Sequence, residues 1–319
     1  MDNLFRLNIS EISKNDILKL YEYDVDWTQE PKESIKELCK QHAKLIRDSY
    51  DYVILYFSGG SDSTTILNAF LDNNIPIDEI ITTTFDQVDI PCFDGIYAQN
   101  YLKMKGYTGI FTNPRISLDK LTTFMKSDTT LSEAKNYTGT INSLTRLSID
   151  KLEQYDFAVR RKRLGNVAHI YGFEHPKVLN INNHYYVVHT VGRELIIRCN
   201  HNDKAINFFS SKTFPKLYVK QAHMIAKLMK RLDVNSLPTE YINKLIRDTH
   251  NPLISPPKSN GSNFIKSKTL SEAWMIYNSF SKDSAFKDLY LNSVLSQQYK
   301  IENAISKLSI DTMKCDLLF

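Results

Sequence analysis

The chain has 319 residues, of which 42% are hydrophobic and 24% are charged, so we expect a folded protein with a large buried core. Its formal net charge of +4 is too small to indicate nucleic-acid binding by itself. The first ten residues lack the apolar region of a signal peptide, and no apolar run is long enough to predict a membrane span. We therefore expect a cytoplasmic protein that does not associate with membranes.

The four cysteines are Cys39, Cys92, Cys199 and Cys315. They lie far apart and form no CxxC motif, which is typical of a protein from a reducing compartment. The histidines also lack the spacing of metal ligands, and no HExxH motif occurs. A zinc site is therefore not expected.

The amino-terminal part of the chain leads towards a buried strand. Residues 1–30 are polar and mixed, and we expect them to form an extension. Apolar residues at three- and four-residue spacing predict an amphipathic helix over 32–48, with Pro31 suited to its first turn. The apolar, β-rich run at 53–57 then predicts a strand that is buried on both faces.

A turn rich in glycine and serine follows this strand, with the sequence SGGSDS at 58–63. Paired glycines allow a sharp turn and the close approach of a ligand to the backbone. An amphipathic helix is predicted next, and Asp62 or Ser63 could cap it. The free N–H groups and positive dipole end of a helix form an anion site, so the pattern predicts phosphate binding. Neither G-x-x-x-x-G-K-[ST] nor G-x-G-x-x-G occurs in the chain.

Strands and helices alternate beyond this turn. We expect a strand at 80–85, a helix at 96–105 ended by Gly106, a strand at 107–112 closed by Asn113 and Pro114, helices at 117–126 and 140–164, and a strand at 167–171. Such alternation implies an α/β fold with a Rossmann-like parallel sheet and helices on both faces.

The pattern changes near residue 180. Strand-like runs at 185–189 and 194–199, around Gly192, predict an antiparallel hairpin, and helices are then expected at 216–232, 239–248, 270–280 and 283–307. We therefore expect an α/β nucleotide-binding domain over 31–180. A hairpin and helical region over 181–319 would pack against the sheet and form a wall of the site.

The SGGSDS segment, in its place after a strand, resembles the pyrophosphate loop (PP-loop) of the N-type ATP pyrophosphatases, whose signature is SGGxDS or SGGxDT. This resemblance implies that ATP is bound with Mg²⁺ and that Asp62 faces the phosphates through the metal ion. In that family, main-chain groups at the end of the second strand hold adenine. The residues that the resemblance assigns to the phosphates are Ser58, Gly59, Gly60, Ser61, Asp62 and Ser63, and those that it assigns to adenine are Thr83, Thr84 and Phe85.

The resemblance also implies a reaction in which ATP is broken between its α- and β-phosphates. A substrate is adenylylated, pyrophosphate leaves, and a nitrogen or sulfur nucleophile then displaces AMP. The leaving pyrophosphate requires nearby positive charge. Lys177 is a candidate because it follows the strand at 167–171 on the edge where ligands bind. Lys220, which shares a helix face with His223, is a second candidate, whereas the basic run at 160–163 is more typical of a solvated helix end.

The loop after the second predicted strand offers further groups. Asp86 and Asp89 could bind a substrate or a second metal, although the loop is also rich in ordinary turn formers. Cys92 could carry sulfur with Cys199 as its partner, as in related enzymes that thiolate RNA bases. An isolated cysteine is more often a small apolar filler.

These observations lead us to expect an adenylylating enzyme that activates a carbonyl or carboxylate of a small molecule or nucleobase for attack by ammonia or an amine. A sulfur transferase, a sulfonucleotide reductase-like protein and a non-catalytic nucleotide sensor remain alternatives. The reductases place Lys where this chain has Ser61, and they carry a carboxy-terminal cysteine motif where this chain has Cys315 alone. The segments GFEHPKV and FPKLYVKQAH resemble PP-loop proteins encoded by tailed phages, which implies a host-cytoplasmic role in nucleotide or nucleic-acid modification or in countering host defence.

Overall fold

The computed structural model describes residues 23–82, 84–86, 93–117, 165–172, 176–181, 184–188, 205–231 and 315–317. The fold and the site are built from these ranges. Several predicted elements lie outside the described residues: the helices at 117–126, 140–164, 239–248, 270–280 and 283–307, and the strand at 194–199.

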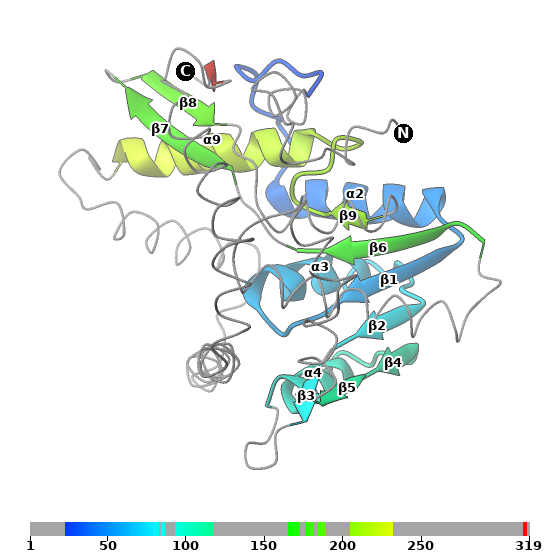
Figure 1. Ribbon diagram of the computed structural model, residues 1–319. Helices are drawn as coiled ribbons and strands as arrows, with labels where there is room; N and C mark the ends of the chain where they lie inside the picture. Colours follow the sequence, from blue (N-terminus) through cyan, green and yellow to red (C-terminus); the bar gives the residue numbers. More distant parts are fainter. Residues whose placement is uncertain are drawn as a thin grey trace, which may run out of the picture.

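A five-stranded sheet in the order β4-β2-β1-β6-β9 forms the centre of the protein (Figure 1). Its strands are Ile110–Thr112 (β4), Glu79–Ile81 (β2), Tyr52–Tyr56 (β1), Val167–Tyr171 (β6) and Ala205–Asn207 (β9). All four pairs of neighbouring strands are parallel. The predicted α/β class with a Rossmann-like parallel sheet is therefore confirmed, whereas helices on both faces of this sheet stay a prediction. Strand β9 belongs to this sheet, so the predicted domain boundary near residue 180 would separate it from the other four strands.

Strand β1 is buried on both faces, as its apolar sequence predicts. Val53 and Leu55 pack on one face with helices α2 (Ile35–Ser49), α3 (Ser61–Leu71) and α4 (Phe93–Met104). Ile54 and Tyr56 pack on the other face with Val167 and residues of the neighbouring strands. Alternate side chains of a strand point to opposite faces, so a continuous apolar run suits this central position.

Helix α2 begins later than the sequence suggests. Its N-cap is Ser34, whose Oγ accepts a 3.1 Å hydrogen bond from the backbone N–H of Glu37. A serine at this position satisfies one of the N–H groups that the first turn leaves unpaired. The expectation that Pro31 lies in the first helical turn is therefore wrong, because the helix starts only after the better cap.

The second predicted strand, at 80–85, is divided in two, and the third, at 107–112, is found over Ile110–Thr112 alone. Beyond β2 and β4, the chain forms Thr84–Asp86 (β3) and Arg115–Ser117 (β5), which pair in parallel as a separate two-stranded sheet. Asn113 and Pro114 follow the last residue of β4, so they close this strand as predicted, and β5 begins directly after them. Asp86 lies in β3, whereas the sequence predicted a loop at this residue. The two added strands extend past the carboxyl edge of the central sheet.

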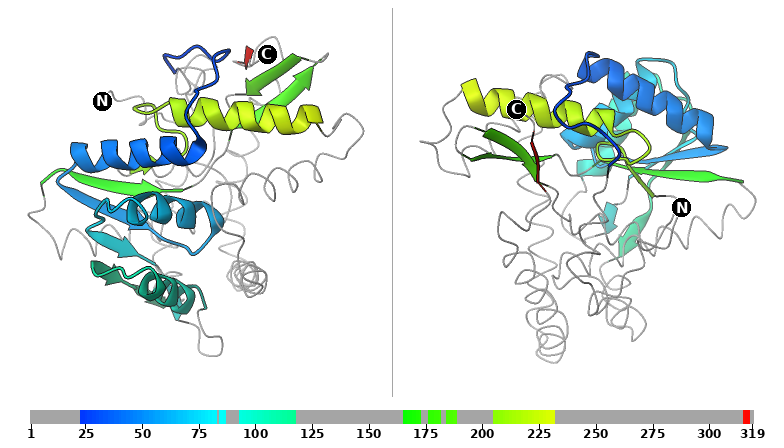
Figure 2. Two further views of the ribbon diagram at one scale, coloured as in Figure 1. Left: turned by 180° about the vertical axis from the view of Figure 1, so that it is seen from behind. Right: turned by 90° about the horizontal axis from the view of Figure 1, so that it is seen from above.

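The predicted hairpin is paired differently from our expectation. His184–Val188 (β8) is a strand, but its antiparallel partners are Lys177–Ile181 (β7) and Cys315–Leu317 (β10). Lys177 is thus the first residue of a strand and not part of the loop that follows β6. The hairpin lies beside helix α9 (Lys216–Arg231) in all three views (Figure 2). Tyr185 and Val187 share a buried cluster with this helix.

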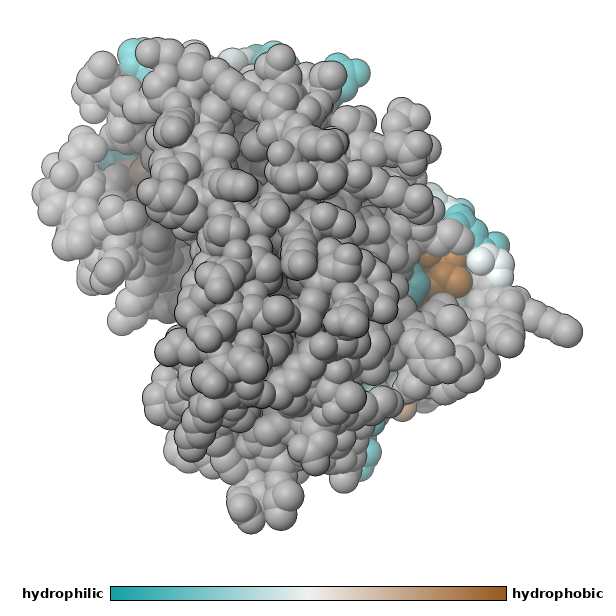
Figure 3. Space-filling view, viewed as in Figure 1, coloured by the Kyte–Doolittle hydropathy of each residue, from teal (hydrophilic) through white to brown (hydrophobic). Residues whose placement is uncertain are grey.

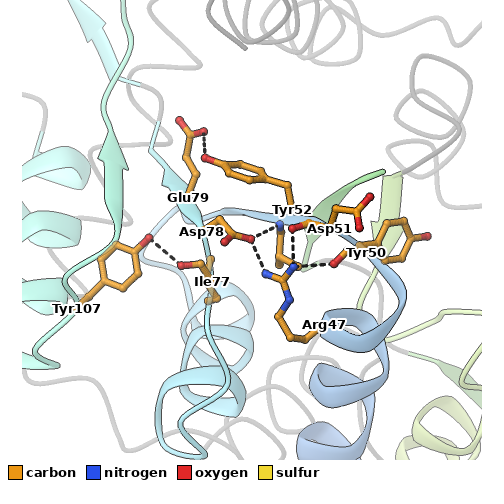
Figure 4. A network of polar contacts seen from close by, with 9 residues as sticks. Arg47, Tyr50, Asp51, Tyr52, Ile77, Asp78, Glu79 and Tyr107 are labelled. Carbon is orange, nitrogen blue, oxygen red and sulfur yellow. Dashed lines mark hydrogen bonds and ion pairs between the residues drawn. The ribbon is translucent and has the colours of Figure 1, made fainter. Parts of the chain in front are cut away.

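An arginine secures the amino edge of the sheet (Figure 4). Arg47, near the end of α2, forms an ion pair with Asp78 and donates to the carbonyl oxygens of Tyr50 at 2.6 Å and Asp51 at 2.8 Å. Asp78 also accepts a 2.7 Å hydrogen bond from the backbone N–H of Val53. These contacts stabilise the starts of β1 and β2 at the edge opposite the SGGSDS turn.

Little hydrophobic surface is visible among the described residues. Figure 3 shows small hydrophobic areas next to hydrophilic ones in this view. The large hydrophobic side chains that the structure leaves exposed in these ranges are Leu45, Met104 and Ile110, on three different elements. Single exposed side chains of this kind are ordinary. In the part of the chain that the structure describes, no helix has the length and apolar character needed to span a membrane.

Candidate functional site

The SGGSDS turn lies where the direction of the sheet's winding changes. From β1 the chain proceeds to β2 and β4 on one side, whereas β6 and β9 extend the sheet on the other side. The carboxyl ends of β1 and β6 therefore form a topological switch point, the usual position of a ligand in an open α/β sheet. Residues 57–60 connect the carboxyl end of β1 to α3 at this point (Figure 1).

Glycines give the turn its backbone shape. Gly59 has a φ of +67°, in the left-handed region that favours glycine. Ser58 Oγ accepts from the backbone N–H of Gly60 at 3.3 Å and lies 3.2 Å from Ser63 Oγ. Ser63 Oγ in turn donates to the Gly60 carbonyl oxygen at 3.2 Å. The two serine hydroxyls thus lie next to each other, with Ser58 exposed and Ser63 buried.

The amino terminus of α3 has no side-chain cap. Its N-cap is Gly60, not Asp62 or Ser63 as the sequence suggested, and Thr64 N–H makes the bond to the Gly60 carbonyl oxygen at 2.9 Å. The first turn of a helix leaves N–H groups without intrahelical partners, and its dipole favours an anion. A glycine cap supplies no carboxylate or hydroxyl of its own to take that place. The arrangement therefore suits a phosphate group.

Strand β3 carries two of the residues that the resemblance assigned to adenine. It pairs in parallel with β5, in a sheet separate from the one that holds β1. Thr84 and Phe85, which were assigned to adenine, lie in β3, whereas Thr83 lies outside the described residues. The contact with adenine itself stays a prediction.

Sequence reasoning missed Gly172, the residue that follows β6. A Cβ built on Gly172 would lie 2.6 Å from Ile66 Cδ1 and 3.3 Å from the backbone N of Ser63. The end of β6 therefore lies directly against the first turn of α3. A glycine just after a predicted strand, at the ligand edge, is the sequence signal that could have drawn attention to it.

Lys220 and His223 face the amino-terminal segment. Lys220 Nζ donates to Glu30 Oε1 and to the Pro31 carbonyl oxygen, both at 2.9 Å. His223 is 2% exposed, and its Nε2 lies 2.8 Å from the Trp27 carbonyl oxygen. The predicted pair thus shares one face of α9, where it holds residues 27–31. A role for Lys220 in the reaction stays a prediction.

The remaining candidates divide into two groups. The basic run at 160–163, Asp89, Cys92 and Cys199 lie outside the described residues, as does the side chain of Lys177. Among the cysteines, Cys39 is buried on α2, and burial raises the pKa of its thiol to about 12. This thiol is therefore not available as a nucleophile. Within the described ranges, no three His, Cys, Asp or Glu residues are placed to hold a metal ion.

The comparisons with known proteins add no assignment. No protein-family model matches the chain, and no curated protein matches it in sequence.

Proposed function

We propose that the protein binds ATP with Mg²⁺ at residues 58–63 and adenylylates a small-molecule or nucleobase acceptor, releasing pyrophosphate. One observation carries the proposal: the SGGSDS turn joins the central strand to a glycine-capped helix at the switch point of a parallel sheet. The resemblance of this segment to the pyrophosphate loop of the N-type ATP pyrophosphatases supports the same function. Asp62 lies in the first turn of that helix, half-buried, where a carboxylate can share Mg²⁺ with phosphate oxygens.

The residues of the turn would act on the leaving group. Backbone N–H groups at the start of α3 would bind the β- and γ-phosphate oxygens, and the hydroxyls of Ser58 and Ser63 could exchange their mutual contact for contacts with phosphate. Mg²⁺, when bound, would neutralise charge that develops on the leaving pyrophosphate. Lys177 and Lys220 are the candidates for additional positive charge near it.

The proposed reaction has two steps. An oxygen of the acceptor's carbonyl or carboxylate attacks the α-phosphorus, and the bond from that phosphorus to the bridging oxygen breaks as pyrophosphate leaves. Ammonia or an amine then attacks the activated carbon, and AMP carries away the acceptor's oxygen. The alternative in which sulfur is the nucleophile would need a thiol other than Cys39, because that thiol is buried and protonated.

The experiment is incubation with α-labelled ATP, Mg²⁺ and a metabolite extract, followed by identification of the labelled products. AMP with pyrophosphate is the expected result. ADP with phosphate would contradict the proposal, and binding without turnover would favour a nucleotide sensor. Replacement of both Cys92 and Cys199 by Ser tests sulfur transfer, because only that route requires a thiol.

A matched pair of variants tests the site. Asp62→Asn should abolish pyrophosphate release, because it removes the carboxylate charge that would hold Mg²⁺ at the phosphates. Asp48→Asn is the control, since Asp48 lies on α2 with a 58% exposed side chain, in an ion pair with Lys44. Activity that survives Asp62→Asn would show that the assignment of the turn is wrong.

A further inference from the structure

Gly172 makes a contact that a side chain would prevent. It follows the last residue of β6, and β6 pairs with β1 along Tyr52–Leu55. A Cβ at Gly172 would lie 2.6 Å from Ile66 Cδ1, and 3.3 Å from both the carbonyl carbon of Asp62 and the backbone N of Ser63. The first of these distances is too short for two carbon atoms, whose optimal separation is about 3.5–4.0 Å.

The neighbouring atoms have little room to move away. Ile66 is fully buried in the core between α3 and the sheet, so its side chain cannot turn into solvent. The atoms of Asp62 and Ser63 belong to the backbone of the first turn of α3. They can move only if that turn moves, and Ser63 itself is only 4% exposed. A side chain at position 172 would therefore force Ile66 to repack within the core and would press against the backbone of the first turn of the helix.

This contact joins the two halves of the switch point. The turn at 58–63 belongs to β1 and α3, whereas Gly172 belongs to β6, the first strand on the opposite side of the sheet. Close approach of one backbone to another is a common reason for glycine at the end of a strand. Here the backbone that Gly172 approaches is the one whose N–H groups would bind phosphate.

We propose that Gly172 is a positioning residue of the phosphate site. Its missing side chain sets how closely the first turn of α3 approaches β6, and so it sets the direction of the Ser63 N–H group. This inference rests on the proposed function. It adds a residue that lies outside the SGGSDS segment and that makes no contact with phosphate itself.

Three variants separate positioning from general stability. Gly172→Ala introduces the Cβ, and Gly172→Ala with Ile66→Val removes Cδ1, which is the atom that collides most severely. Gly106→Ala is the control, because Gly106 has a φ of +67° and its Cβ would meet nothing within 4 Å. The control therefore strains the backbone at the end of α4 and leaves the contact between β6 and α3 intact.

Two measurements are made on each variant: the Kd for Mg·ATP and the NMR shifts of the Asp62 and Ser63 amides without ligand. We expect Gly172→Ala to raise the Kd by roughly tenfold to a hundredfold if the Ser63 N–H group loses its hydrogen bond to phosphate, because a hydrogen bond to a charged group contributes about that much. The two amide signals should move, and adding Ile66→Val should restore part of the affinity. Gly106→Ala should leave both measurements unchanged. A Gly172→Ala protein with unchanged Kd and unmoved amides would overturn the inference.

The two proposals can fail separately. If the unaltered protein does not bind Mg·ATP, the proposed function fails, and the amide shifts still test whether Gly172 positions the turn. If Gly172→Ala does not fold, the double variant, which lacks the worst collision, takes its place. If neither folds, position 172 is required for the fold as a whole, and the specific positioning role is refuted.

Discussion

The hydroxyl of Thr82 donates a 2.6 Å hydrogen bond to the carbonyl oxygen of Phe57, the residue that joins β1 to the SGGSDS turn. Both residues are buried, Thr82 at 2% exposed and Phe57 at 1%. The backbone N–H of Phe57 also donates to the Ile81 carbonyl oxygen at 2.8 Å. A side chain from the neighbouring strand therefore holds the chain at the point where β1 ends and the turn begins.

Thr82→Val should destabilise the protein, because it leaves the buried Phe57 carbonyl without its side-chain partner. The expected loss in free energy of unfolding is about 1–3 kcal/mol. Thr82→Ser keeps the hydroxyl and should lose less. Urea unfolding of the two variants measures the difference, and an equal or larger loss in Thr82→Ser would show that the hydrogen bond contributes no more than the methyl group.

His42 is a buried imidazole in an aromatic environment. It lies on α2, fully buried, with ring centroids 4.7 Å from Phe208 and 5.0 Å from Phe214. Neither ring nitrogen has a hydrogen-bond partner among the described residues. Burial lowers the pKa of His42 to about 3, and the nearby backbone of Phe208 opposes this only in part. The folded protein therefore holds this histidine neutral.

This histidine should make stability fall in acid. Its pKa is about 3 in the folded protein, against an ordinary value of 6.5, so between these values the unfolded chain binds more protons. Above pH 6.5 His42 is neutral in both states and does not reduce the free energy of unfolding. As the pH falls from 6.5 towards 3, the unfolded chain gains a proton at this residue and the free energy of unfolding decreases. The full decrease in free energy of unfolding is on the order of 5 kcal/mol, at about 1.36 kcal/mol for each pKa unit. The free energy of unfolding, measured by urea titration between pH 7 and about pH 4, should therefore decrease.

His42→Phe and His42→Leu should both flatten that decrease. The comparison uses the slope with pH, so a constant loss from repacking in either variant does not affect the conclusion. An unchanged slope in both variants would show that other groups cause the acid sensitivity.

The elements that the sequence predicts well share one property: their own residues determine them. Strand β6 is found at its predicted residues, and α9 ends within one residue of its expected end. The glycine that ends α4, Gly106, has the left-handed φ of +67° expected of a helix-ending residue. In each case a continuous apolar pattern or a local turn residue carries the information.

The errors arise where a distant partner decides the structure. Lys177–Ile181 has no strong strand signal of its own, and it becomes a strand by pairing with His184–Val188. Likewise, Arg115–Ser117 was not predicted as a strand, and it pairs with Thr84–Asp86. The candidate site follows the same rule. The SGGSDS turn is evident in the sequence, whereas the importance of Gly172 depends on the approach of β6 to α3, which only the fold reveals.

Cys39 should be unreactive in the native protein. Burial raises the pKa of its thiol to about 12, so at pH 8 only about one molecule in ten thousand would carry the thiolate. The side chain is also only 3% exposed. Iodoacetamide labelling, followed by mass spectrometry of the peptide that contains Cys39, should show modification only after unfolding in urea. Rapid labelling of the native protein would mean that α2 opens readily.

The contacts of Glu30 allow two lysines of α9 to be compared. Lys220, whose side chain is 15% exposed, contacts Glu30 at 2.9 Å and also donates to the Pro31 carbonyl oxygen. Lys227, at 54% exposed, forms an ion pair with the same carboxylate. Burial raises the pKa of Glu30, but hydrogen bonds from Lys227 and Lys220 outweigh it and lower the pKa overall. The stability that Glu30 contributes is therefore present above its ordinary pKa of 4.5 and is lost as the pH falls below it.

Lys220→Met should cost more stability than Lys227→Met, about 1–3 kcal/mol against less than about 1 kcal/mol, because Lys220 is less exposed and bonds to two partners. A double-mutant cycle with Glu30→Gln, measured by urea unfolding, should give a coupling energy above about 0.5 kcal/mol for Lys220.

The rates of pyrophosphate release in the folded variants then address the proposed reaction. If Lys220 also serves the leaving group, Lys220→Met lowers kcat and Lys227→Met does not, although each variant removes one of the two lysine contacts of Glu30. Equal kcat values in the two variants would restrict Lys220 to holding the amino-terminal segment against α9.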